Sequence, residues 1–227
     1  MDFDFNCSIL SVWKETLSSY QLSIESLNKP NLISLDEFYR NELPSLIQQR
    51  NPNPYVTTAE LSKLMQWKLT RGKWRPRLLD FVSSLDESLV KSASEKAFEA
   101  LPDLNKAISE LTVLKGVGPA TASAVLAAYA PHVAPFMSDE AIEAALGNSK
   151  EYSLKQYLLF ANKLLAKAKI TAENIPDIEN ASWESFTASD VERALWSSAI
   201  RAKLPAKQSD PSTEIKTSKI SKRKRKR

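Results

Sequence analysis

The sequence predicts an all-α fold. Only 4 of its 227 residues are glycine, and alternating runs of β-branched residues are scarce, whereas alanine, leucine, lysine, glutamate and serine dominate. With 43% hydrophobic residues, a chain of this length can bury a substantial core in one body of one or two lobes. It contains no run of about 18 apolar residues, so no membrane span is predicted.

Helix start and stop signals divide the chain into segments. Residues 1–50 favour helix but carry no interpretable motif. The clearest helix follows Pro54, because Thr57 and Glu60 have the spacing of a capping box and Gly72 ends the apolar periodicity. Further helices are expected after Pro76, at 78–85, and then at 86–101, 103–114, 119–129, 139–146, 153–169 and 189–203, the last with a capping box formed by Ser189 and Glu192.

Positive charge is concentrated at the C-terminal end. Residues 205–227 contain nine Lys or Arg and two Asp or Glu, a net charge of +7, whereas the whole chain carries +4. The predicted body, residues 1–204, therefore carries about −3, and a DNA-binding body would need its positive charge gathered on one face. Residues 205–227 are expected to be disordered, because almost no large apolar side chain is available for burial.

The end of this tail, KISKRKRKR, is typical of a nuclear import signal. The alternative is a solubilising tail or one that contacts DNA without specificity. The expected partner is therefore a nuclear import receptor, and the expected location is the nucleus. The residues that would bind the receptor are Lys222, Arg223, Lys224, Arg225, Lys226 and Arg227.

Cysteine and histidine are nearly absent, since Cys7 and His132 are the only ones. A disulfide framework, a cysteine-based zinc site and a four-cysteine iron–sulfur cluster are thereby excluded, and a reducing compartment is expected. No Gly-rich nucleotide loop and no Ser-His-Asp arrangement is recognisable. We therefore expect neither a metal site built from side chains nor an organic cofactor.

Two of the four glycines lie two residues apart in the string LKGVGPATASAVL, residues 114–126. Such use of a scarce residue indicates a tight turn with positive φ, or the close approach of another backbone. Pro119 suits the first position of the following helix. Main-chain N–H groups at such a turn face outward and bind phosphate. The sequence therefore predicts a helix-hairpin-helix element that binds DNA through Lys115, Gly116, Val117, Gly118, Ala120 and Thr121.

This string, followed by APFMSDEAIEAAL at 134–146, resembles the helix-hairpin-helix region of the HhH-GPD superfamily of base-excision DNA glycosylases. The resemblance covers about residues 57–146, and the Amun-like branch is the most similar. It implies a two-lobed helical fold, DNA as partner, and a monovalent cation held by hairpin carbonyls. Ala120 stands where bifunctional members have a Schiff-base lysine, and Lys115 does not replace it. Lyase activity through that lysine is therefore not expected.

The resemblance also places Asp139 where the family has an aspartate at the start of another helix. A carboxylate there would stabilise the positive charge that develops on the sugar as a base departs. Alternatively, Asp139 only caps the helix that follows it. Both roles can coexist in one residue.

Aromatic and basic residues alternate in the stretch QWKLTRGKWRPR, residues 66–77, which contains five Lys or Arg. Aromatic rings stack on unpaired bases while basic groups hold phosphates. Trp67, Lys73 and Trp74 are therefore expected to border a flipped-base pocket, with Gln66 as a wedge into the duplex. Alternatively, both tryptophans are core residues and the charges form a solvated face.

Three classes of function remain open on the sequence alone. The first is a nuclear monofunctional DNA glycosylase. The second is a DNA reader or chromatin adaptor that kept the fold but lost the chemistry. The third is a helical protein–protein scaffold in which the hairpin serves packing only.

Overall fold

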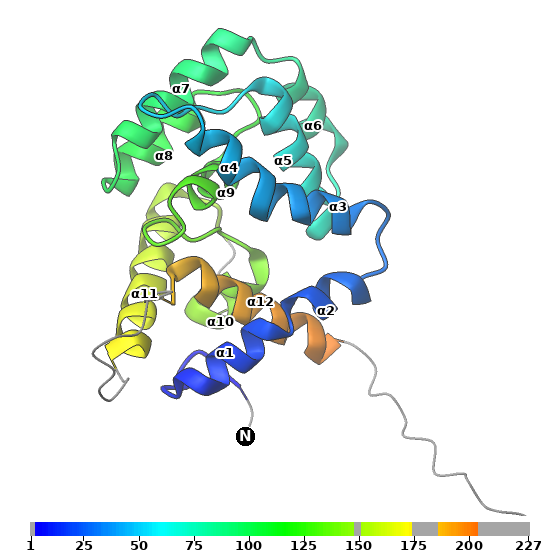
Figure 1. Ribbon diagram of the computed structural model, residues 1–227, viewed down its shortest axis with the longest axis vertical. Helices are drawn as coiled ribbons and strands as arrows, with labels where there is room; N and C mark the ends of the chain where they lie inside the picture. Colours follow the sequence, from blue (N-terminus) through cyan, green and yellow to red (C-terminus); the bar gives the residue numbers. More distant parts are fainter. Residues whose placement is uncertain (1–2, 148–150, 174–185, 204–227) are drawn as a thin grey trace, which may run out of the picture.

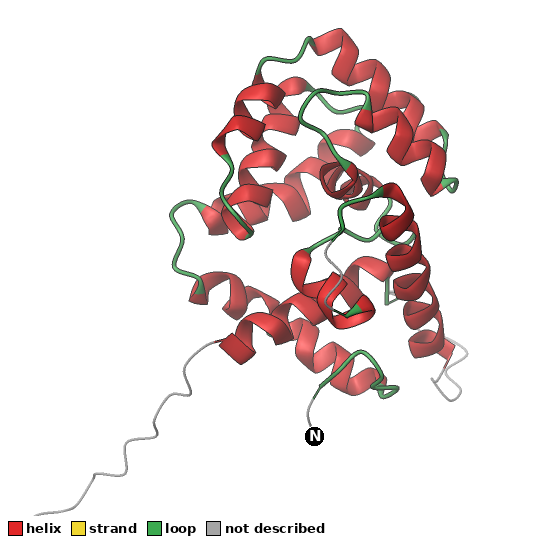
Figure 2. Cartoon of the chain, turned by 180° about the vertical axis from the view of Figure 1, so that it is seen from behind, coloured by secondary structure: helices red, strands yellow, loops and turns green. Residues whose placement is uncertain are grey.

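The computed structural model describes residues 3–147, 151–173 and 186–203. Within these ranges all regular structure is helical, which confirms the all-α class (Figure 2), and no described helix is long and apolar enough to cross a membrane. The predicted basic tail, residues 205–227, lies outside the described residues. The helices are α1 (Leu10–Ser18), α2 (Tyr20–Ser26), α3 (Leu32–Glu37), the π-helical turn η1 (Phe38–Glu42), α4 (Leu43–Gln48), α5 (Thr58–Arg71), α6 (Pro76–Ser83), α7 (Glu87–Glu99), α8 (Leu104–Thr112), α9 (Pro119–Tyr129), α10 (Asp139–Leu146), α11 (Leu154–Glu173) and α12 (Ala188–Lys203).

The helices gather in two groups (Figure 1). The middle of the chain, α3 to α9, forms one group, in which α5 and α9 pack together. In the other group, α12 packs against α1, α2, α10 and α11, so N-terminal and C-terminal segments share one unit. The largest side chains with almost no exposure include Trp13, Trp67 and Trp196.

Local sequence signals set the bounds of the central helices. The capping box predicted before α5 is present: the Glu60 amide donates to Thr57 Oγ1 (3.2 Å), and the Thr57 amide donates to Glu60 Oε2 (2.9 Å). Gly72 is the residue that ends α5, as expected. The bounds of α9 and α10 coincide with those predicted at 119–129 and 139–146.

The capping box predicted for the last helix is wrong. The helix begins at Ala188, and the box is formed by Thr187 and Asp190, whose amides donate to each other's side-chain oxygens over 2.7 Å and 3.1 Å. The Ser189–Glu192 pair has the same spacing two residues later. Glu192 is instead buried and binds a partner from another helix.

That partner is Arg71, at the end of α5. Its Nη2 lies 3.1 Å from Glu192 Oε1, and both side chains are 3% exposed. The Trp196 ring lies 4.2 Å from the guanidinium carbon, and three further rings lie within 6 Å, those of Tyr20, Trp67 and Phe136. Burial alone would lower the pKa of Arg71, but Glu192 and neighbouring acidic groups reverse the direction and raise it. The pair therefore joins the two groups of helices as a charged contact.

We predict that Arg71→Met lowers the free energy of unfolding by about 3–5 kcal/mol, because it leaves the Glu192 carboxylate buried without its counter-charge. Urea denaturation of the full chain measures this. Lys63→Met is the matched control, since the 3.5 Å pair of Lys63 with Glu42 is exposed and its loss should cost less than about 1 kcal/mol. Equal effects of the two substitutions would contradict the importance of the buried pair.

Candidate functional site

The two closely spaced glycines lie in a turn between α8 and α9, as the sequence predicts. Gly116 has a φ of +88°. Gly118 is extended and exposed, and Pro119 occupies the first position of α9. The turn therefore presents its main chain at the surface beside the N-terminus of α9.

The two glycines are needed for different reasons. A Cβ on Gly116 would lie 2.9 Å from Cβ of Phe81, a residue of α6, in addition to the strain of positive φ. A Cβ on Gly118 would meet no atom within 4 Å. Packing inside the protein therefore explains Gly116 but not Gly118, whose missing side chain leaves room for something outside the protein.

We predict that Gly116→Ala lowers the free energy of unfolding by about 2–4 kcal/mol, from backbone strain and overpacking against α6. Gly118→Ala should change it by no more than about 0.5 kcal/mol. Thermal denaturation of both variants checks this contrast. A severe loss with Gly118→Ala would show that this glycine, too, has a structural cause.

Free hydrogen-bond donors at the turn are provided by Gly118 and Ala120, whose amides have no partner among the described residues. Other predicted contacts are occupied or buried. The Val117 amide donates to the Leu114 carbonyl over 3.0 Å, and the Val117 side chain is 5% exposed. The Thr121 amide donates to the Gly118 carbonyl over 2.9 Å. The Lys115 ammonium nitrogen lies over the Phe81 ring, 4.6 Å from its centre. The turn therefore offers main-chain rather than side-chain contacts.

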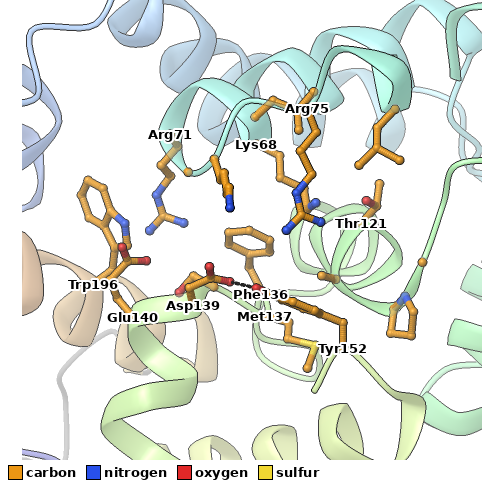
Figure 3. Close-up of a pocket in the computed structure, with 18 of the residues that line it drawn as sticks. Lys68, Arg71, Arg75, Thr121, Phe136, Met137, Asp139, Glu140, Tyr152 and Trp196 are labelled. Carbon is orange, nitrogen blue, oxygen red and sulfur yellow. Dashed lines mark hydrogen bonds between the residues drawn. The ribbon is translucent and has the colours of Figure 1, made fainter. Parts of the chain in front are cut away.

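A cavity of about 580 Å³ lies beside this turn (Figure 3). Its walls come from the end of α5, the following loop, the N-termini of α9 and α10, and α12. This volume is within the range of about 300–1,000 Å³ typical of ligand sites. The lining includes the turn residues Gly116, Gly118, Pro119, Ala120 and Thr121, and the apolar Phe136, Met137 and Trp196.

The cavity is rich in positive charge although the body is not. Among the described residues, six Lys or Arg line it against two Asp or Glu. Three of the cations have protein partners: Lys29 donates to the Thr70, Arg71 and Gly72 carbonyls, Arg71 pairs with Glu192, and Lys203 pairs with Glu140. The other three have no hydrogen-bond or ion-pair partner among the described residues, and all come from the 66–77 stretch: Lys68, Lys73 and Arg75.

Asp139 faces this cavity from the first residue of α10 (Figure 3). The N-cap position belongs to Ser138, and the Asp139 side chain does not cap the helix; its Oδ1 accepts a hydrogen bond from Tyr152 Oη over 2.7 Å. Burial, reinforced by this hydrogen bond, raises the pKa of Tyr152 to about 12. Tyr152 therefore stays protonated at neutral pH and orients the carboxylate.

Lys68 enters the cavity from the opposite wall (Figure 3). Burial, reinforced by the positive charge of Arg75, lowers the pKa of the Lys68 ammonium to about 8, and the Asp139 carboxylate opposes this shift. A charged Lys68 ammonium in this partly buried position lowers the free energy of unfolding, because burial removes water from the charge. Partly buried groups with strongly shifted pKa values cluster at functional sites.

We predict that Lys68→Met raises the free energy of unfolding at pH 7 by about 1–2 kcal/mol, because it removes the desolvation cost of the ammonium. The pKa of Lys68 is lower in the folded chain than in the unfolded chain, so the native protein loses this cost as pH rises from about 8 to about 10.5. The advantage of the variant should therefore shrink over that range. Chemical denaturation at pH 7 and pH 10 measures it, and a pH-independent difference would contradict the shift.

The residues expected to border a flipped base lie in different environments in the structure. Trp67 does not fit that role: it is 1% exposed, stacks on Tyr39 at 3.5 Å and donates to Asp36 Oδ1 over 2.8 Å. Trp74 is 56% exposed and Gln66 is exposed, but neither lines the cavity, whereas Lys73 does.

Lys68, Arg75 and Tyr152 line the cavity but were missed as individual candidates. Lys68 follows the buried Leu64 by four residues, so it lies on the inward face of α5, which the sequence could have indicated. Tyr152 is 39% exposed, and its polar neighbours Glu151 and Ser153 were the available signal. Neither Lys68 nor Tyr152 could be matched with Asp139 before folding was known.

Comparisons with protein-family models, with curated proteins and with solved structures found no match for this chain. Among the described residues, no group of three His, Cys, Asp or Glu is placed to hold a metal ion. The functional inference therefore rests on the geometry of the turn and the cavity.

Proposed function

We propose that this protein binds DNA through its helix-hairpin-helix turn, receives one unstacked nucleotide in the adjacent cavity, and hydrolyses the bond between base and sugar as a monofunctional DNA glycosylase. One observation carries the proposal: the exposed turn at Gly118 and the Asp139 carboxylate border the same cation-rich cavity of about 580 Å³. DNA enzymes that act on a base extrude it into a pocket of this kind.

Binding would begin at the DNA backbone. The free amides of Gly118 and Ala120 lie at the N-terminus of α9, where the helix dipole favours an anion. Lys73 and Arg75 are exposed, line the same cavity and have no protein partners among the described residues. Because Gly118 has open space outside it, a phosphate could approach its amide closely. These groups would hold the phosphates that flank an extruded nucleotide.

The chemistry assigned to Asp139 is electrostatic. As the bond between the sugar carbon and the base nitrogen breaks, its electron pair leaves with the base and the sugar becomes positively charged. The carboxylate, oriented by Tyr152, would stabilise this charge until water adds to the sugar carbon. The proton that this water loses passes through solvent to the departed base. Base and abasic DNA are the products. Ala120 supplies no amine, so this reaction involves no covalent intermediate at that position.

The proposal places the protein in the nucleus. Its basis is the sequence 222–227, KRKRKR, which lies outside the described residues. A block of like charges suits the acidic groove of an import receptor.

Asp139→Asn is the test of the chemistry. The full chain is incubated with duplexes that each carry one modified or mispaired base, and abasic sites are scored by strand cleavage in alkali. We expect the wild-type chain to release a base and the variant to be slower by about 100-fold or more. Equal rates would remove Asp139 from the reaction.

Gly118→Val is the matched test of DNA binding, since its side chain would protrude into open space and leave folding intact. We expect it to weaken binding about tenfold and to reduce the salt dependence, while Lys106→Arg, at an exposed position on α8, changes neither. If the wild-type chain binds DNA, Gly118→Val weakens this binding and no abasic sites form, the protein is a DNA reader and not an enzyme. Binding that is lost only when residues 222–227 are replaced by glutamine would contradict the role of the turn.

A further inference from the structure

The cavity contains a second reactive group in addition to the carboxylate. The Lys68 amine projects into it from α5 (Figure 3) and has no hydrogen-bond or ion-pair partner in the part of the chain that the structure describes. Lysines that are partly buried are usually paired or reach solvent, because an unpaired ammonium is costly to desolvate. An unpartnered amine in a ligand-sized cavity therefore points to a partner that arrives with the ligand.

The groups around this amine suit one class of ligand. Arg75 and Lys73 line the same cavity and could hold a phosphate ester. On the opposite wall, Tyr152 Oη carries a proton beside Asp139. The remaining charged groups that line the cavity are Lys29, Arg71, Glu140 and Lys203, each of which has a protein partner. Of the two lysines left without a protein partner among the described residues, Lys73 is exposed and Lys68 is partly buried in the cavity.

We propose that Lys68 is a nucleophile that forms a reversible imine with the aldehyde of a phosphorylated sugar bound in this cavity. For the DNA source of that aldehyde the inference rests on the proposed function, because removal of a base leaves a sugar whose ring-opened form is an aldehyde. A free sugar phosphate offers the same chemistry. The position differs from the one occupied by Ala120, where the resemblance places the lysine of other proteins.

The step balances without a further reactant. The lone pair of Lys68 Nζ adds to the carbonyl carbon, the nitrogen loses a proton and the carbonyl oxygen takes one, which gives a neutral carbinolamine. The hydroxyl then leaves as water while nitrogen forms a double bond to carbon, with a proton supplied by solvent. Water reverses the reaction.

Neutral amine is available for this step near neutral pH. With a pKa of about 8, Lys68 has on the order of 100-fold more neutral amine at pH 7.5 than an ordinary lysine. Burial and Arg75 lower this pKa, and Asp139 opposes them. Lysines become nucleophiles in proteins under such conditions, desolvated or beside another cation.

The test uses the full chain at pH 7.5 in two arms. In the first, 2-deoxyribose 5-phosphate and cyanoborohydride are added, and the reduced adduct is located by peptide mass mapping. We expect at least about tenfold more modification at Lys68 than at exposed Lys106. In the second arm, a duplex with a preformed abasic site and borohydride should give a protein–DNA adduct at the same residue.

Lys68→Arg is the decisive variant, because it keeps the positive charge but a guanidinium does not form the imine. It should abolish the adduct at this position in both arms, whereas Lys106→Arg should leave it unchanged. Modification spread evenly over surface lysines, or trapping that persists in Lys68→Arg, overturns the inference. An adduct with the free sugar but not with DNA assigns the site to small sugar phosphates.

Failure of this inference is separable from failure of the proposed function. Neither arm requires base release, so trapping at Lys68 without any glycosylase activity would keep the amine site and reject the proposed enzyme. Base release that depends on Asp139, without trapping at Lys68, would do the reverse.

Discussion

The buried pair of Arg71 and Glu192 is the contact on which the site depends. It joins the end of α5, in the middle of the chain, to α12, near its C-terminal end, and Arg71 also forms part of the cavity wall. Lys29 fixes the same end of α5 by donating to three consecutive carbonyls at distances of 2.6 to 3.2 Å. Lys68 lies one helical turn before this anchored end. The direction in which Lys68 enters the cavity is therefore fixed by contacts made between elements far apart in sequence.

Positive charge is concentrated at the cavity although the net charge of the body is negative. Residues 1–204 carry a net charge of about −3, which by itself argues against attraction to DNA. In the part of the chain that the structure describes, the fold nevertheless brings six Lys or Arg and two acidic residues together around one cavity. Half of those cations stabilise the fold, and the other half remain without protein partners in the described ranges. A local excess of this kind can attract an anion although the body as a whole is acidic.

Helix bounds were predicted well where the signal that sets them lies within a few residues of sequence. The Thr57–Glu60 box, Gly72 and Pro119 gave the bounds of α5 and the start of α9 correctly. Predictions failed where the deciding partner was distant. Glu192 has capping-box spacing but is captured by Arg71, and Trp67 sits in a basic stretch but is held by Tyr39 and Asp36. The contact between Asp139 and Tyr152 likewise joins the start of α10 to the segment before α11, and no spacing rule connects them.

The two reactive groups of the cavity influence each other in a way that separates their roles. Asp139 raises the pKa of Lys68, while burial and Arg75 lower it. Loss of the Asp139 charge, as in Asp139→Asn, would remove the opposing influence and favour loss of the Lys68 proton. The substitution that removes the carboxylate would therefore make the Lys68 amine more available as a nucleophile, not less.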